Sequence, residues 1–152
     1  MTRGNARELA VHLIYSQTFT GEEPHVEITT RLDKEYYKIL SEDHEVYLER
    51  PSRAQVAYID GVVTGVANRT EELDGYIQKF SIGWDISRIS RLTRCIMQLA
   101  IYEILYLDDI PVGVAVSEAV RIAKKYDGDD TGAFVNGILG SFARSLTAGS
   151  QE

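Results

Sequence analysis

Apolar residues recur at intervals of three and four along almost the whole chain, and this spacing constrains the fold more than any other feature of the sequence. Such intervals place side chains on one face of an α-helix. The stripe in the first stretch consists of Ala6, Leu9, Ala10, Leu13 and Ile14. Alternating apolar and polar residues, which would indicate a strand, do not continue for a useful length anywhere. The sequence therefore predicts an all-α protein.

Two further helices are predicted in the first half of the chain. A weaker apolar stripe is formed by Ile28, Leu32, Tyr36, Ile39 and Leu40. The acidic segment 41–51 follows it and is expected to be a loop, although the sequence leaves a further helical turn open. Ser52 has a hydroxyl suited to cap the next helix. The stripe of that helix is Ile59, Val62, Val63 and Val66.

Four more helices are predicted in the second half. Thr70 begins the first as a capping hydroxyl, with acidic residues behind it at the positive end of the helix dipole. A break at 81–85 contains the single tryptophan and precedes the longest helix. Joints at 108–111 and 127–130 set off the last two helices, and Asp130 is well placed to cap the final one. The four stripes are Leu73, Ile77 and Phe80; Ile89, Leu92, Ile96, Leu99, Ala100, Ile104 and Leu107; Val112, Val116, Ala119, Val120 and Ala123; and Val135, Ile138, Leu139, Phe142 and Leu146.

About seven helices joined mostly by short loops indicate two packed helical bundles. The 152 residues suit a single domain, since a chain of this length buries about 70% of its unfolded surface without a metal or a disulfide. We expect an N-terminal half over about 1–68, a C-terminal half over about 69–146 and a flexible tail over 147–152.

Composition narrows the class of protein. A single cysteine, Cys95, excludes an internal disulfide and fits a reducing compartment. No apolar run is long enough to span a membrane and no apolar leader is present, so a cytoplasmic protein is expected. The net charge of −7 disfavours phosphate binding, but residues 21–50 hold nine acidic and four basic residues and account for −5 of it. A basic face elsewhere on the molecule is compatible with this distribution.

A search for catalytic residues finds little. The three histidines are His12, His25 and His44. They are not spaced to share a metal with Cys95, which itself lies beside an apolar stripe, as a small packed residue would. The glycines of segment 61–65 lack the Lys-Ser/Thr ending of a phosphate-binding loop. We therefore expect no catalytic residue, no metal site and no cofactor.

Several residues away from the apolar stripes favour nucleic-acid binding. Arg3 and Arg7 lie one turn apart at the edge of the first helix, where they are suited to bridge phosphates. Tyr15 lies off the stripe of the same helix, which predicts an exposed aromatic ring. At about 100° per residue, Phe134 stands about 90° from the centre of the last stripe, a position from which the ring either stacks on a base or is buried by a neighbouring helix. Phe80 fits a core position better than a stacking platform.

Several short segments of the chain form a specific set, although each alone is unspecific. They are Arg3-Gly4-Asn5-Ala6-Arg7-Glu8-Leu9-Ala10, Leu99-Ala100-Ile101-Tyr102-Glu103-Ile104-Leu105, Asp109-Ile110-Pro111, Ser117-Glu118-Ala119-Val120 with Ala123-Lys124, and Phe134-Val135-Asn136-Gly137-Ile138-Leu139. With Trp84 ahead of Ser87-Arg88, the set resembles the NusB family of bacterial transcription antitermination factors. The resemblance extends over about residues 3–144 and is weakest over 20–55.

The resemblance implies an all-α fold of two helical bundles without enzymatic activity. Proteins of the NusB family pair with a small-subunit ribosomal protein of the NusE type, and the pair binds the single-stranded boxA element of nascent ribosomal RNA transcripts. The complex joins RNA polymerase and other Nus factors and suppresses premature, Rho-dependent termination. By resemblance, the same partners are expected for this chain.

The resemblance also implies roles for individual positions. The residues that fall where the family contacts RNA are Arg3, Arg7, Tyr15, Phe80, Asp130 and Phe134. The longest helix and the one before it fall where the protein partner docks. Arg88, Arg91 and Arg94 follow the polar flank of that longest helix, and they form either a solvated face or a contact with the protein partner.

The sequence departs from the family pattern at two places. Gly4 and Asn5 dilute the usual N-terminal arginine run, and Thr93 replaces an acidic residue expected near the protein partner. Both changes, together with the net charge of −7, predict weak RNA binding by the chain alone, because few phosphates are neutralised. We therefore expect the protein partner to contribute much of the RNA-binding surface.

Two other functions stay open on the sequence. Similar helical domains precede the catalytic domains of ribosomal-RNA cytosine methyltransferases, so a separate accessory subunit of such an enzyme is one alternative. A protein–protein adaptor without RNA binding is the other. The sequence also leaves open whether the free protein is a monomer or a homodimer.

Overall fold

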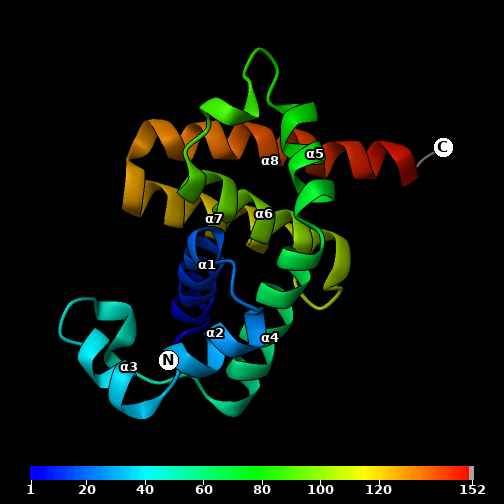
Figure 1. The fold of residues 1–152 in the computed structure, drawn as a ribbon. Coiled ribbons are helices and arrows are strands. Elements are labelled where there is room, and N and C mark those ends of the chain that lie inside the picture. The colour runs from blue at the N-terminus through cyan, green and yellow to red at the C-terminus, as the bar shows by residue number, and fades with distance from the viewer. Residues whose placement is uncertain (151–152) are drawn as a thin grey trace. The chain divides into compact units, whose positions relative to one another are not determined.

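Helices account for all the regular structure in the part of the chain that the structure describes. The computed structural model describes residues 1–150, with side chains through residue 147. Eight α-helices and two short 3₁₀-helices occur there without a strand, which confirms the all-α prediction (Figure 1). Over the same residues, none of the helices combines the length and the apolar content needed to cross a membrane. The chain divides into two compact units, Met1–Asn68 and Arg69–Glu152.

The first unit is built around its N-terminal helix, α1 (Arg3–Thr20). Helix α4 (Arg53–Asn68) packs along α1, and α2 (Pro24–Arg31) contacts both of them. Helix α3 (Lys34–Leu40) leads to the 3₁₀-helix η1 (Glu45–Leu48), which returns to α1. Segments far apart in the sequence therefore meet at α1.

The N-terminal half of helix α1 contains a stretch that is buried around its whole circumference. Thr2 caps the start of α1, because the Thr2 hydroxyl accepts a hydrogen bond from the Asn5 amide at 3.0 Å. Residues 6–11 are all buried, including the charged side chains of Arg7 and Glu8. The predicted apolar stripe is confirmed, but the buried surface is wider than one face.

The continuous stripe predicted over 28–40 is wrong, because the chain breaks between α2 and α3. The carboxylate of Asp33 accepts a hydrogen bond from the amide of Tyr36 at 3.2 Å and so caps a new helix. The break changes the register, so that Tyr37 is buried while Tyr36 is exposed. In the segment 41–51, the structure adds the single turn of η1.

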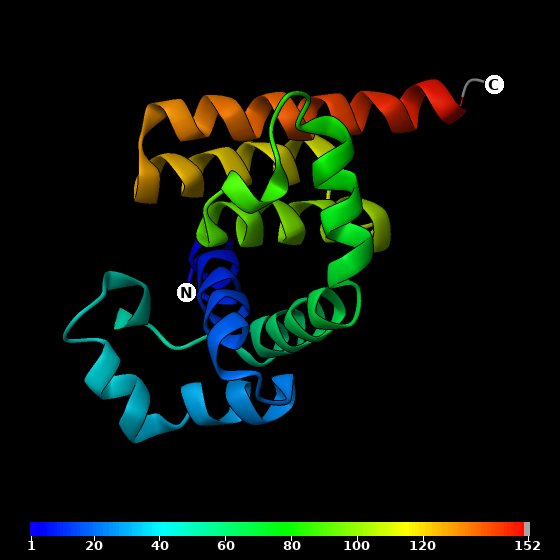
Figure 2. The same ribbon diagram turned by 45° about the horizontal axis from the view of Figure 1, so that its top comes forward.

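The second unit contains the four remaining α-helices. They are α5 (Thr70–Phe80), α6 (Arg91–Tyr106), α7 (Val112–Asp127) and α8 (Asp129–Ser150), with the 3₁₀-helix η2 (Ile86–Arg88) between α5 and α6. Helix α7 packs against α6 and α8. Helix α5 packs across α6 and α8 (Figure 2). The predicted core positions Ile96, Leu99, Val135, Leu139 and Phe142 are all buried, which confirms most of the stripes of α6 and α8. Two predicted stripe positions are instead exposed, Leu146 of α8 at 39% and Val112 of α7 at 42%.

Two helix ends in this unit differ from the prediction. Thr70 is the first helical residue and not the cap, and Arg69 before it makes no capping hydrogen bond through its side chain. Helix α8 continues to Ser150, although the sequence predicted its end near Leu146. The predicted tail 147–152 is therefore helical as far as Ser150, and its last two residues lie outside the described part of the chain.

Helices α7 and α8 meet at a single residue, Gly128. Its φ of 93° is a backbone conformation that residues with a side chain rarely adopt. The Gly128 amide donates to the Lys124 carbonyl at 3.0 Å, and the Gly128 carbonyl accepts from the Gly132 amide at 3.1 Å, so one residue ends α7 and begins α8. The prediction that Asp130 caps α8 is therefore wrong. Asp130 lies in the first turn, where a carboxylate still interacts favourably with the positive end of the helix dipole.

The thiol of Cys95 lies in the core of the second unit and is 1% exposed. Burial raises its pKa to about 12, because a thiolate would lose its hydration there. In the unfolded chain a cysteine ionises near a pH of about 8.5. Above that pH the unfolded state releases a proton that the folded state retains, so the free energy of unfolding falls as pH rises.

We expect this effect to reach about 1.4 kcal/mol per pH unit between roughly pH 9 and pH 12. Denaturant titrations of the protein and of Cys95→Ala across that range measure it. The variant should lose stability less steeply with pH. Equal slopes for the two proteins would contradict the predicted ionisation of this thiol.

Candidate functional site

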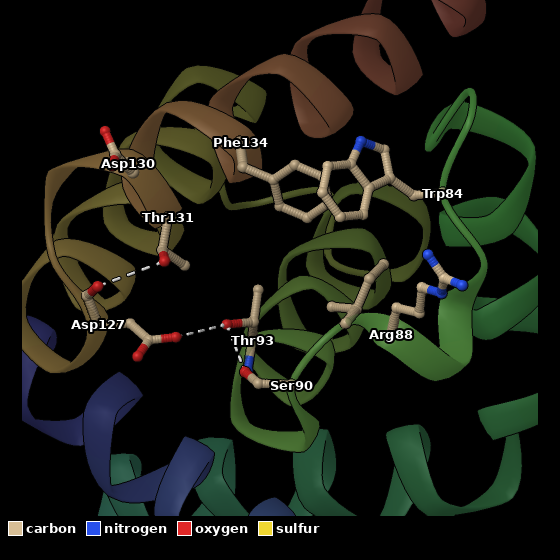
Figure 3. Close-up of a pocket in the computed structure, with 9 residues that line it drawn as sticks. Trp84, Arg88, Ser90, Thr93, Asp127, Asp130, Thr131 and Phe134 are labelled. Atoms are coloured by element: carbon tan, nitrogen blue, oxygen red, sulfur yellow. Dashed lines mark hydrogen bonds between the residues drawn. The ribbon is translucent and has the colours of Figure 1, made fainter.

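A cleft of about 420 Å³ opens on the second unit where α6, α7 and α8 begin or end (Figure 3). One wall consists of two aromatic rings, Trp84 from the loop before η2 and Phe134 from α8. Hydroxyl and carboxylate groups from the start of α6, the end of α7 and the start of α8 form the opposite side. These are Ser90, Thr93, Asp127, Asp130 and Thr131.

The two rings of the aromatic wall are in contact with each other. The centroids of Trp84 and Phe134 are 5.8 Å apart, and the ring planes are inclined by 69°, which is an edge-to-face contact. Trp84 is 54% exposed and Phe134 is half-buried, so one face of the pair is open to solvent. Gln78 fixes the loop, since its amide donates to the Trp84 carbonyl and accepts from the Ile86 amide, both at 2.9 Å.

The polar side of the cleft is ordered by a short chain of hydrogen bonds. Ser90 caps α6, accepting from the Thr93 amide at 3.2 Å and donating its hydroxyl to the Thr93 hydroxyl at 2.8 Å. The Thr93 hydroxyl in turn donates to Oδ2 of Asp127 at 3.4 Å, and Thr131 donates to the Asp127 carbonyl at 3.3 Å. The start of α6 and the joint of α7 with α8 are thereby linked across the cleft.

The charges around the cleft suit a base better than a phosphate. Asp127 directs its carboxylate to the polar side, Asp130 lies at the margin of the cleft with its carboxylate turned outward, and Arg88 places one guanidinium near the aromatic wall (Figure 3). Carboxylates repel phosphates but accept hydrogen bonds from the exocyclic amino groups of bases. Every base also has a π-face that stacks on aromatic rings. The cleft can therefore hold one unstacked base, with the phosphates outside.

Phe80 does not line this cleft. Its ring lies 5.9 Å from the ring of the buried Phe142 in an edge-to-face contact, and the ammonium of Lys79 lies 5.5 Å from its centroid. Phe80 is itself half-buried. The structure thus places Phe80 at the margin of the core, while Phe134 and Asp130 share the cleft.

The three site residues predicted on α1 belong to the first unit. Arg3 is exposed and accessible to a phosphate. The expectation that Arg7 is equally accessible is wrong, because Arg7 lies in the fully buried part of α1 and is 7% exposed. Tyr15 is half-buried, and its ring makes an edge-to-face contact at 5.0 Å with Phe19, which is 61% exposed. The exposed aromatic surface of this helix is therefore shared between two rings.

The three arginines predicted for the protein partner have different surroundings. Arg88 lines the cleft and Arg91 is exposed at the start of α6. Arg94 is half-buried, and its guanidinium lies 4.0 Å from the carboxylate of Asp74, which also accepts a hydrogen bond from Gln98 at 2.7 Å. Arg94 thus connects α6 to α5 and presents less charge to solvent than the other two.

Trp84 is one of the cleft residues that the sequence analysis did not predict, together with Ser90, Thr93, Asp127 and Thr131. The exposure of Trp84 could have been inferred from the sequence. Trp84 lies with Gly83 in a break between two helices, so it does not belong to the apolar stripe of either helix. The pairing with Phe134 could not be inferred, because 49 residues separate the two positions in the chain.

Comparisons with known proteins agree on one family. The model of the NusB family matches residues 4–144. The transcription antitermination protein NusB of Acetivibrio thermocellus is 42% identical over 144 residues, which cover 95% of this chain and 90% of that protein. The solved structure of T. maritima NusB has a TM-score of 0.77 at 26% identity, covering 95% of this chain and 92% of that one. A crystal structure of NusB and NusE in complex with dsRNA has a TM-score of 0.73 at 23% identity, covering 94% of this chain and 96% of that one, and shows the shared fold.

Proposed function

The chain belongs to the NusB family, and from this premise we propose that it is a non-enzymatic transcription antitermination factor of the cytoplasm. It binds boxA RNA of ribosomal RNA transcripts together with a NusE-type ribosomal protein, and it joins RNA polymerase and other Nus factors to suppress Rho-dependent termination. The observation that supports RNA binding most directly is the cleft of the second unit, where two solvent-facing rings lie opposite hydrogen-bond acceptors.

Within this proposal, each predicted residue has a physical role. Phe134 stacks on an unstacked base, and Asp130 lies at the margin of the cleft, beside the path of the strand. Arg3 contacts a phosphate, and Tyr15 offers a ring to the strand. Arg7 and Phe80 are less accessible and support these contacts from within the fold.

The protein partner is needed because this chain offers little positive charge to RNA. Its net charge is −7, and two aspartates line the cleft. Counterion release, which drives binding to phosphates, scales with the number of cations at the interface. A NusE-type protein would supply the missing cations, and α5 and α6, with Arg88, Arg91 and Arg94, are the surface we propose for it.

A gel-shift titration with boxA RNA tests the proposal. The RNA is mixed with this protein, with the NusE-type protein and with both at physiological salt. We expect a tight complex only with both proteins. Equal affinity for a scrambled RNA would reject boxA binding, and equally tight binding by this chain alone would reject the role of the partner.

Replacing Asp130 by asparagine should strengthen RNA binding about 2- to 5-fold at low salt. The carboxylate is exposed beside the place proposed for the strand, where its charge repels phosphates, whereas asparagine keeps one acceptor oxygen. Fluorescence anisotropy with the heterodimer measures the affinity. The matched control is Asp109→Asn, which removes an exposed charge in the loop between α6 and α7 and should leave affinity unchanged. A loss of affinity in Asp130→Asn would show that the charge itself holds the base.

A further inference from the structure

We propose that Glu8, His12 and His44, in the first unit, bind one divalent transition-metal ion, for which Zn²⁺ is the best match. One potential ligand atom from each of the three residues lies within 4.8 Å of those of the other two. Two imidazoles and a carboxylate form a common zinc ligand set, with water in the fourth position. None of these three residues is among those proposed to contact RNA.

The fold brings the three residues together in two steps. Glu8 and His12 are four residues apart on α1, so their side chains lie one above the other on the same face of the helix. His44 immediately precedes η1, which packs onto α1. The rings of His12 and His44 are 4.9 Å apart between centroids and nearly perpendicular, at 85°.

The ligand atoms, all within 4.8 Å of one another, lie within reach of one metal ion. Zinc bonds of about 2.1 Å in a tetrahedral site place the ligand atoms about 3.4 Å apart. Both histidines are half-buried, so small rotations of their rings can bring the set to that spacing. Glu8 is completely buried, and a buried carboxylate is stabilised by a cation beside it.

His12 already has the outer partner that a metal-binding histidine needs. Its Nδ1 lies 3.1 Å from the hydroxyl oxygen of Tyr47, which also accepts a hydrogen bond from Arg31 at 2.8 Å. A metal on Nε2 leaves the proton on Nδ1, from where it is donated to Tyr47. Such a hydrogen bond fixes the tautomer and the orientation of the ring.

Coordination by His44 has one structural consequence. Nδ1 of His44 now accepts a hydrogen bond from the amide of Val46 at 3.1 Å. If Nδ1 coordinates the metal, its lone pair is no longer available to this amide. If Nε2 coordinates, the proton moves to Nδ1, with the same result. Metal binding must therefore release the Val46 amide, whichever nitrogen is used.

Titration of the untagged, chelator-treated full chain with ZnCl₂ tests the proposal. Isothermal calorimetry should give one equivalent bound, and CoCl₂ should give the visible absorption of a low-symmetry site with nitrogen and oxygen ligands. Either His12→Gln or His44→Asn should weaken binding at least about 10-fold. The matched control is His25→Asn, because His25 lies in the same unit but is exposed and faces Asp60 at 3.5 Å. This variant should bind zinc as tightly as the unaltered protein.

A second measurement does not depend on the variants folding. In the unaltered protein, the amide resonance of Val46 should shift in an NMR titration with ZnCl₂, together with the ring resonances of His12 and His44. Absence of saturable one-to-one binding, an unmoved Val46 amide, or an equal loss of affinity in His25→Asn would each overturn the proposal. Because boxA RNA is not needed for any of these measurements, failure here would leave the proposed RNA function unaffected.

Discussion

Replacing Phe142 by alanine should lower the free energy of unfolding by about 3–5 kcal/mol, the usual cost of emptying a buried phenylalanine site. The ring is 1% exposed and lies at the centre of the second unit. It makes edge-to-face contacts with Tyr76 at 5.1 Å and with Phe80 at 5.9 Å, so its removal leaves a cavity and also breaks two aromatic pairs. Urea denaturation followed by circular dichroism measures the loss.

A matched control for this prediction lies on the same helix. Leu146 is 39% exposed, and Leu146→Ala should change stability by less than about 0.5 kcal/mol, as surface substitutions usually do. If the two variants lost similar amounts, the assignment of Phe142 to the core would be wrong.

Replacing Phe134 by alanine should weaken RNA binding by the heterodimer about 5- to 150-fold, since stacking of a base on an aromatic ring contributes about 1–3 kcal/mol. Trp84→Ala should have an effect in the same range, because the two rings form one wall of the cleft. Anisotropy titrations with labelled boxA RNA measure both. Trp84→Phe, which keeps a ring at that position, should recover most of the affinity.

Thermal melts separate a binding effect from a folding effect. Phe134 is half-buried, so its alanine variant should melt much closer to the unaltered protein than Phe142→Ala does. A large fall in melting temperature with RNA affinity preserved would instead assign Phe134 to the core and exclude the stacking role.

The long amphipathic helices could be predicted from the sequence because their apolar residues keep one period from end to end. This holds for α1, α6 and α8, whose predicted core positions are mostly buried. The break between α2 and α3 was missed because the spacing of Ile28 and Leu32 continues across it by coincidence. The residue that indicates this break is Asp33, because its carboxylate caps α3. A cap is a local feature that the spacing of apolar residues does not reveal.

The candidate site was predictable only in part. The angular position of Phe134 on its helix indicated a ring away from the core centre, and the structure places it at the cleft. The burial of Arg7 could not be foreseen, because it depends on how many neighbours surround α1 and not on the sequence of α1. The proximity of His12 and His44 likewise results from tertiary packing between segments distant in the chain.

The joint at Gly128 leaves the chain no slack between α7 and α8. One added residue there would turn α8 by about 100° about its own axis relative to α7 and swing Phe134 away from Trp84. The orientation of the Phe134 ring is therefore set by a one-residue joint between two helices and not by a flexible loop. We therefore expect an insertion at Gly128 to disrupt the cleft severely, although Gly128 itself contacts no ligand.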